Sequence, residues 1–310
     1  MTIQSISVVD LLQTKTIDYK QPLEQLVCSV ETDNLDSGFV CVTDYKQAHY
    51  HRYMHRQDAP VLVLLHPLGG NCTNWLHIIE GLRQDYTIYA VDLPAHGLTT
   101  YRIDSDHAER YVRWFSELMD YWQLPAAHLV GYSFGGRVAA VVAAASPARV
   151  QSLTLFSPAL KPANNGWAGI EAWSIEKTAE HSPDPLLRIS IRVILEEMLS
   201  SAASEANKID LKYATETFLI DQKRQSYHGV TDGLRWLYDE QDHHIDWLLL
   251  AASIPVETLF GDNDKYCPLN TSGLQGIDQL HVSSVADVGH LLPLERPHEC
   301  VAAIRRASTI

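Results

Sequence analysis

The chain has 310 residues, of which 46% are hydrophobic and 20% charged, values typical of a soluble globular protein with a sizeable core. The formal net charge of −14 at pH 7 argues against nucleic acid or an anionic membrane as partner, because either would need a basic face. No signal-peptide pattern opens the chain, and no apolar run reaches the roughly 18 residues of a membrane span.

The cysteines are five in number, with no Cys-x-x-Cys pair among them. An odd count without paired spacing favours reduced thiols over a disulfide framework or a zinc site. We therefore expect a cytoplasmic protein without a bound metal. The cysteines are Cys28, Cys41, Cys72, Cys267 and Cys300.

Strand-like and helix-like patterns alternate from Gly38 onward. Two alternating segments, 38–43 and 48–54, flank turn residues and predict a β-hairpin. Short apolar runs predict strands that are buried on both faces, at 61–65, 87–91, 128–130, 150–156, 255–260 and 280–285. Amphipathic stretches between them predict helices at 75–82, 108–122, 134–145 and 297–307. This order predicts an α/β protein with a mostly parallel, doubly wound sheet and an antiparallel edge.

The alternation stops between residues 159 and 252, where helical patterns such as 185–200 and 209–222 replace the strands. We expect a helical cap at 159–252, inserted between core segments 1–158 and 253–310. Helices packed on the flank of the sheet are the alternative. The segment also holds four of the seven tryptophans, Trp167, Trp173, Trp236 and Trp247.

A candidate nucleophile lies in the sequence Gly131-Tyr132-Ser133-Phe134-Gly135. It follows a predicted strand and precedes a predicted helix. A Gly-x-Ser-x-Gly turn in that position exposes the serine hydroxyl at a helix N-terminus, where the backbone amides favour negative charge. The sequence therefore predicts Ser133 as a nucleophile, which needs a histidine to accept its proton.

Partners for Ser133 follow later strands. His290 comes after the last predicted strand, and loops at the carboxyl ends of parallel strands lie near one another. His290 is therefore the candidate base. Asp262 and Asp264 both follow the strand at 255–260 and compete for the role of the acid that orients the base, although either also suits a turn or a helix cap.

Four further motifs occur in order along the chain. His66-Pro67-Leu68-Gly69-Gly70 resembles the His-Gly oxyanion loop of the α/β-hydrolase superfamily, and the segment 92–97 resembles its Asp-x-Pro-Gly-His-Gly turn. Gly261 with Asp264 matches its Gly-x-x-Asp, and Gly289 with His290 matches its Gly-His. The resemblance covers Gly38 to Ile310 and implies the α/β-hydrolase fold: a mostly parallel twisted sheet with flanking helices and an inserted helical cap.

The resemblance also implies roles for individual residues. It favours Asp264 over Asp262 as the acid, and it places an oxyanion hole at the backbone amides of Leu68 and Phe134. Two residues depart from the family pattern, since Pro67 and Ala95 stand where the family has glycine. The donor role of Leu68 survives this change, but the shape of the loop is expected to differ.

A closer resemblance concerns the reaction type. The elbow with Gly136 and Arg137, together with the stretch 70–75, resembles the menaquinone-pathway synthase that eliminates pyruvate and closes a cyclohexadiene ring. In that family the elbow arginine helps to bind a carboxylated substrate. The same Gly-Gly-Arg also follows the serine of ordinary esterases, so both reaction types stay open.

Other candidate sites are set aside. His49, His51 and His55 alternate along a predicted strand and could be ligands on one face, but no carboxylate or cysteine follows at a fitting spacing, so an exposed hairpin is predicted. His243 and His244 suit a solvated helix end. No Gly-x-Gly-x-x-Gly follows a strand, so no nucleotide cofactor is expected.

The leading hypothesis is a cofactor-free serine hydrolase that cleaves an ester, thioester or related acyl bond of a small, mostly apolar molecule. A Ser133-His290-Asp264 triad would carry the reaction. One alternative is a lyase or cyclase that uses Ser133 and His290 only for proton transfer. The other is a non-catalytic receptor that keeps the fold. An aspartate nucleophile is excluded because the elbow holds a serine.

Overall fold

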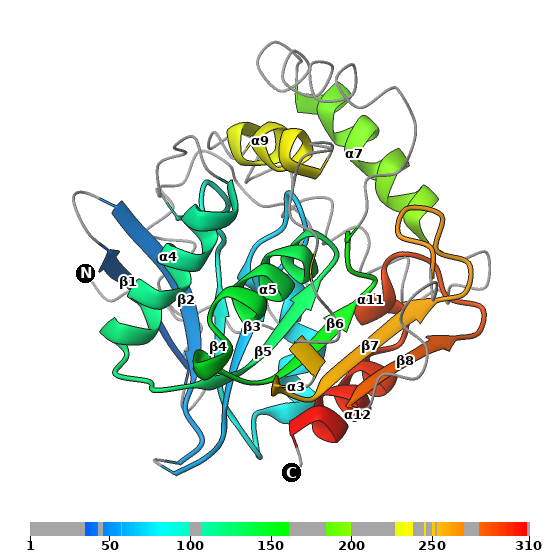
Figure 1. Cartoon of the computed structure of the whole chain (residues 1–310). Coiled ribbons are helices and arrows are strands. Elements are labelled where there is room, and N and C mark those ends of the chain that lie inside the picture. The colour runs from blue at the N-terminus through cyan, green and yellow to red at the C-terminus, as the bar shows by residue number, and fades with distance from the viewer. Residues whose placement is uncertain are drawn as a thin grey trace.

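A computed structural model describes residues 35–42, 46–56, 58–99, 107–160, 184–199, 227–237, 245, 250–251, 253–269 and 279–308. These residues form one twisted sheet with helices on both faces (Figure 1). None of the helices in these ranges is long and apolar enough to cross a membrane.

The sheet has eight strands in the order β1-β2-β4-β3-β5-β6-β7-β8. β2 is antiparallel to β1 and to β4, and every other neighbouring pair is parallel. The predicted α/β class, with a mostly parallel sheet and an antiparallel edge, is confirmed. The strands are β1 (Leu35–Val42), β2 (Lys46–Tyr53), β3 (Val61–Leu65), β4 (Thr87–Val91), β5 (Ala127–Tyr132), β6 (Val150–Phe156), β7 (Val256–Gly261) and β8 (Leu280–Val285).

The helices follow the predicted positions closely in the core. The observed bounds of the helix at 134–145 equal the predicted ones, whereas the helix predicted at 75–82 begins one residue later, after a 3-10 turn that ends at Trp75. The described helices are η1 (Cys72–Trp75), α3 (Leu76–Leu82), α4 (His107–Tyr121), α5 (Phe134–Ala145), η2 (Pro147–Arg149), α7 (Asp184–Met198), α9 (Tyr227–Leu237), α11 (Leu292–Glu295) and α12 (Pro297–Ser308).

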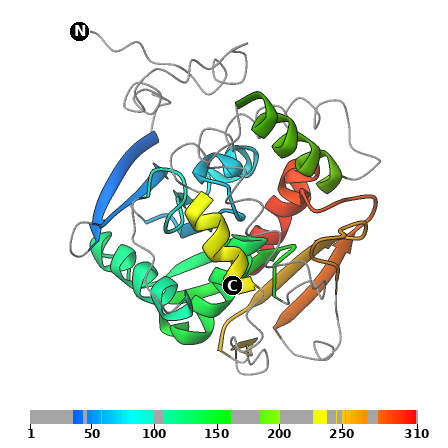
Figure 2. The same ribbon diagram turned by 90° about the horizontal axis from the view of Figure 1, so that it is seen from above.

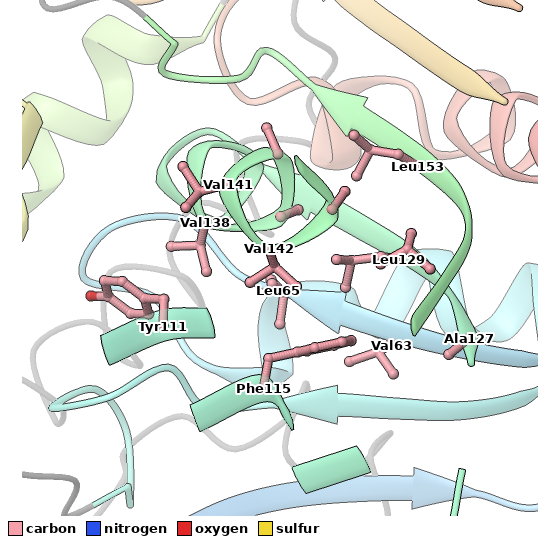
Figure 3. Close-up of a cluster of buried hydrophobic side chains, with 14 of the residues drawn as sticks. Val63, Leu65, Tyr111, Phe115, Ala127, Leu129, Val138, Val141, Val142 and Leu153 are labelled. Carbon is pink, nitrogen blue, oxygen red and sulfur yellow. The ribbon is translucent and has the colours of Figure 1, made fainter. Parts of the chain in front are cut away.

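Alternation along the buried strands creates two hydrophobic cores. In β3, Val63 and Leu65 point to one face and Leu62 and Leu64 to the other, because successive side chains of a strand lie on opposite faces. The first face packs against α4 and α5; Figure 3 shows side chains of α5, such as Val142, close to those of β3 and β5. The second face packs against α3 and α12. A continuous apolar run is therefore needed to fill both cores.

The strand order reverses between β3 and β5. β3 has β4 on one side and β5 on the other, so the chain winds away from β3 in both directions. The helices that follow these two strands, α3 and α5, pack on opposite faces of the sheet. Open α/β sheets bind their ligands at the carboxyl ends of the strands at such a reversal. Ser133 directly follows β5, and the segment 66–70 directly follows β3.

Two helices from the predicted cap segment lie beyond this edge of the sheet. Figure 1 shows α7 and α9 above the carboxyl ends of the central strands. α7 corresponds to the predicted helix at 185–200, whereas the predicted helix at 209–222 lies outside the described residues. The sequence patterns did not indicate α9, which contains Gly229 and Gly233, and glycine lowers helix propensity.

Candidate active site

Ser133 lies on a strained turn between β5 and α5. Its φ of 53° and ψ of −115° are unusual for a residue with a side chain. A Cβ on Gly131 would lie 2.4 Å from the carbonyl oxygen of Gly135, and one on Gly135 would lie 2.2 Å from that of Leu65. Only glycine therefore fits on either side of the serine, which explains the Gly-x-Ser-x-Gly spacing.

Ser133, His290 and Asp264 form a continuous hydrogen-bonded chain. His290 Nε2 lies 3.0 Å from Ser133 Oγ, and His290 Nδ1 lies 2.8 Å from Asp264 Oδ2. All three residues are buried. The sequence separation of 157 residues between serine and histidine is bridged because both follow the carboxyl ends of parallel strands.

Asp264, rather than Asp262, contacts the histidine. Oδ1 of Asp264 accepts the backbone N–H groups of Tyr266 and Cys267, each at 2.9 Å. Burial pushes the pKa of Asp264 upward, but the hydrogen bond and charge of His290 outweigh it, and the net pKa is lowered. Asp262 is exposed and accepts a hydrogen bond from the backbone of Val288.

The backbone of His290 is held on both sides. Its N–H donates to the carbonyl oxygen of Met198 at 2.8 Å, and its carbonyl accepts the hydroxyl of Tyr132 at 2.9 Å. Met198 ends α7, where the last carbonyls lack intrahelical donors. Gly289, the preceding residue, donates its N–H to the buried carboxylate of Glu295. Sequence patterns did not indicate the two bonds of the His290 backbone, because both pair residues from distant segments.

The two amides expected to form the oxyanion hole are available as donors. Leu68 is the second residue of a turn closed by a hydrogen bond from the N–H of Gly70 to the carbonyl of Pro67, at 3.0 Å. Phe134 is the first residue of α5, a position at which amides lack intrahelical acceptors. Within the described ranges, neither amide donates to a protein acceptor.

The loop after β3 is tied to the loop after β4. His66 donates from Nδ1 to the carbonyl of Pro67 at 2.7 Å and accepts the N–H of Leu93 at Nε2, at 2.9 Å. Burial lowers the pKa of His66 to about 3, so the ring is neutral and can donate from one nitrogen and accept at the other. Ala95 adopts a φ of 59°, the left-handed conformation that the family's glycine at this position adopts easily.

The Asp92 carboxylate organises the same loop. It accepts hydrogen bonds from His49 Nδ1 at 2.8 Å and from the backbone N–H groups of Cys72 at 2.7 Å and Leu98 at 2.9 Å. The predicted exposed hairpin is wrong for His49, which is 2% exposed. His55 is exposed as predicted. The sequence spacing around the histidines suggested no nearby carboxylate or cysteine. The fold nevertheless brings both beside β2, Asp92 from the end of β4 and Cys72 from η1.

Helix α9 packs directly onto the residues around Ser133. A Cβ on Gly233 would lie 2.4 Å from the Leu68 side chain and 3.1 Å from the Phe134 ring. The Trp236 ring is buried, stacks on Tyr111 with centroids 5.2 Å apart and meets the Phe134 ring edge-on. Figure 2 shows α9 crossing over this region of the sheet. Glycine at position 233 therefore permits a close approach of this helix to both expected oxyanion residues.

Two further polar groups lie beside these residues. Burial together with the Asp264 carboxylate raises the pKa of the Cys267 thiol, and the nearby Ser133 hydroxyl partly offsets this rise. The guanidinium of Arg137 lies 4.8 Å above the Trp236 ring and donates to the carbonyl of Leu160. The sequence analysis identified Arg137 but gave Cys267 no role, although it comes three residues after Asp264.

Comparisons with known proteins agree with the fold. Residues 60–297 match the family model for the alpha/beta hydrolase fold. The chain is 37% identical over 255 residues to the pimeloyl-[acyl-carrier protein] methyl ester esterase of Aeromonas salmonicida, which covers 80% of this chain and 95% of the esterase. It is also 37% identical over 243 residues to the dihydrolipoyllysine-residue acetyltransferase component of the acetoin cleaving system of Pseudomonas putida.

The chain spans 59% of that acetyltransferase component and 27% of the corresponding component from Cupriavidus necator. Among solved structures, it superposes on 2-hydroxy-6-oxo-6-phenylhexa-2,4-dienoate hydrolase from Rhodococcus sp. strain RHA1 with a TM-score of 0.71 at 16% identity, which covers 88% of this chain and 98% of that one. This likeness supports the fold alone. The family match over residues 60–297 shows that the chain belongs to the α/β-hydrolase-fold family.

Proposed function

We propose that this protein is a serine hydrolase that cleaves the ester or thioester bond of a small, mostly apolar molecule. The observation that carries the proposal is the position of His290, 3.0 Å from Ser133 Oγ and 2.8 Å from Asp264 Oδ2. A histidine between a hydroxyl and a carboxylate can deprotonate the hydroxyl, because the carboxylate holds the required tautomer and stabilises the imidazolium.

In the proposed reaction, Ser133 Oγ bonds to the carbonyl carbon of the substrate while His290 Nε2 takes the hydroxyl proton. The tetrahedral intermediate collapses, and His290 gives this proton to the departing alcohol or thiol. Water then attacks the acyl-enzyme by the same steps and releases the acid. Asp264 keeps a proton on Nδ1 throughout, so Nε2 is free to accept.

The developing oxyanion would be bound by the backbone amides of Leu68 and Phe134. Removal of one such donor typically costs about 10²- to 10³-fold in rate. Both amides lack a protein acceptor among the described residues, which supports this role.

The substrate class rests on the surroundings and on the relatives. Leu68, Phe134 and Trp236 place apolar surface beside the serine, which favours an apolar acyl or alcohol group. The Aeromonas relative is named as an esterase of a methyl ester, which supports an ester substrate here. We propose that residues 159–252 form the cap over this site, flanked by core segments 1–158 and 253–310; the close packing of α9 on Phe134 supports this division.

The lyase or cyclase alternative depends on Arg137 as a ligand for a substrate carboxylate. Its guanidinium lies over the Trp236 ring and donates to the carbonyl of Leu160, so protein groups already hold part of it in place. This observation favours hydrolysis. Mass spectrometry of the enzyme during turnover separates the two, since only the hydrolase carries an acyl adduct on Ser133.

Covalent labelling tests the proposed nucleophile. The wild-type chain is expected to react with a fluorophosphonate probe and to hydrolyse p-nitrophenyl esters, and Ser133→Ala is expected to lose both. Ser116→Ala is a matched control, because that serine lies on α4 and donates only to the carbonyl of Val112. Labelling of Ser133→Ala at the wild-type rate would refute the assignment, and loss of labelling in Ser116→Ala would show that the readout follows folding instead.

The cellular location rests on the cysteines. Within the described part of the chain, Cys72, Cys267 and Cys300 form no disulfide bond, which suits the reducing cytoplasm that we propose as its location.

A further inference from the structure

Three potential metal ligands lie together on the face of the sheet opposite α4 and α5. His49 and His51 alternate on β2, so both side chains point to the same face. Cys72 begins η1, which follows the loop after β3. One ring nitrogen of each histidine and the sulfur of Cys72 lie within 4.8 Å of one another.

A carboxylate orients two of these residues. Asp92 accepts the Nδ1–H of His49 at 2.8 Å, which leaves Nε2 as the nitrogen with a lone pair. The other oxygen of Asp92 accepts the backbone N–H of Cys72 at 2.7 Å. Histidines that bind metals commonly donate their second nitrogen to a carboxylate, which fixes the tautomer and raises the basicity of the ring.

The burial of these groups points to a ligand. Cys72 is 3% exposed and His49 is 2% exposed. Nδ1 of His51 is buried and has no hydrogen-bond partner within the described ranges. A buried polar atom without a partner costs free energy, and coordination of a cation by this nitrogen would remove that cost.

We propose that His49, His51 and Cys72 form a binding site for Zn²⁺. Two imidazole nitrogens and a thiolate are donors that Zn²⁺ prefers, and three protein ligands leave a fourth position for water. Binding would release the proton of the Cys72 thiol to solvent and would involve no change of oxidation state.

The bound ion would connect β2 to η1. Cys72 comes four residues after Leu68, so the ion would anchor the loop of the expected oxyanion hole to the sheet. The role follows from the position of the ligands and does not depend on the reaction at Ser133. It predicts that Zn²⁺ raises the thermal unfolding midpoint of the full chain.

The test uses the tag-free full chain, stripped of metal and then incubated with Zn²⁺. We expect the wild type to retain about one Zn²⁺ per chain after desalting and to unfold at a higher temperature with the metal. Cys72→Ala and His51→Gln are expected to bind Zn²⁺ at least about tenfold more weakly, since even changes outside the coordination sphere cost about 10- to 100-fold.

Two matched controls separate the site from general effects of the substitutions. Cys300→Ala removes another buried thiol, on α12, and His128→Gln alters another buried histidine, which is hydrogen-bonded to Ser152. Both are expected to retain Zn²⁺ as the wild type does. Retention of Zn²⁺ by Cys72→Ala at the wild-type level, or no retention by the wild type, would overturn the proposal.

Cobalt spectroscopy decides the question even where Cys72→Ala does not fold. Co²⁺ added to the wild type in place of Zn²⁺ is expected to give a thiolate-to-cobalt charge-transfer band that is kept in Cys300→Ala and lost in His51→Gln. A wild-type spectrum without that band would refute ligation by Cys72, and a band that persists unchanged in His51→Gln would overturn ligation by His51.

Discussion

Replacement of Asp264 by asparagine tests the proposed triad through the tautomer of His290. Oδ1 of Asp264 accepts two backbone N–H groups, from Tyr266 and Cys267, and Oδ2 faces His290 Nδ1 at 2.8 Å. Because an amide nitrogen cannot accept hydrogen bonds, the asparagine oxygen is expected to take the position of Oδ1. Its NH₂ group then donates to Nδ1 of His290 and keeps the ring proton on Nε2, where it blocks transfer of the serine proton.

The expected loss follows from this exchange of tautomers. The same replacement in a serine protease triad lowers the rate about 10⁴-fold, which at 1.36 kcal/mol for each factor of ten corresponds to about 5.4 kcal/mol of transition-state stabilisation. Since the geometry around His290 is otherwise retained, we expect a loss of this order in kcat/KM for a p-nitrophenyl ester.

Asp262→Asn is the matched control. Asp262 lies two residues earlier on the same loop, is exposed, and accepts the N–H of Val288 instead of facing His290, so its replacement is expected to leave kcat/KM unchanged. Urea unfolding of both variants checks that the fold is intact. A loss smaller than about tenfold for Asp264→Asn, or about 1.4 kcal/mol, would refute the role assigned to this carboxylate.

Three further predictions concern the supports of the site. Gly135→Ala would place a Cβ 2.2 Å from the carbonyl oxygen of Leu65. We expect it to lower the free energy of unfolding, measured in urea, by about 1–3 kcal/mol or more, and wild-type stability would contradict this reasoning. Tyr132→Phe removes the 2.9 Å hydrogen bond to the carbonyl of His290. We expect it to lower the free energy of unfolding by about 1 kcal/mol and to lower kcat. An unchanged kcat would show that this bond does not position the histidine. The stability contributed by ionised Asp264 is expected to be fully present above the ordinary pKa of 3.8 and to be lost as the pH falls through the lower pKa of the folded state. The difference in unfolding free energy between wild type and Asp264→Asn is therefore expected to shrink in acid. A difference that grows in acid would contradict the direction of the pKa shift.

Patterns within short segments predicted most strands of the sheet and the turn that holds Ser133. The apolar runs at 61–65, 87–91 and 150–156 have the bounds of β3, β4 and β6, because a strand buried on both faces must be apolar along most of its length. The run at 280–285 has the bounds of β8, but its predicted burial on both faces is wrong, because β8 is an edge strand without a buried residue. The sequence also predicted the turn at Ser133. The glycines on either side of the serine are required there by close backbone contacts, some within a few residues and some with the adjacent strand β3.

Contacts between distant segments could not be predicted in this way. Asp262 and Asp264 occupy similar positions in the sequence, and the residues alone left both open as partners of His290 until the family pattern favoured one. Only the folded loop shows which of them lies against the histidine, 26 residues away in sequence. The same holds for Tyr132, whose hydroxyl reaches the His290 backbone across 158 residues.

The sequence by itself therefore determined the class of the fold, the order of its strands along the chain and Ser133 as the candidate nucleophile. Only the tertiary structure shows that His49 is buried against Asp92, that Cys72 lies beside His49, and that α9 packs on Phe134 at Gly233. The physical reason is the range of the interactions. Periodicity and glycine spacing report local backbone geometry, whereas burial and side-chain pairing depend on which strands and helices the fold brings side by side.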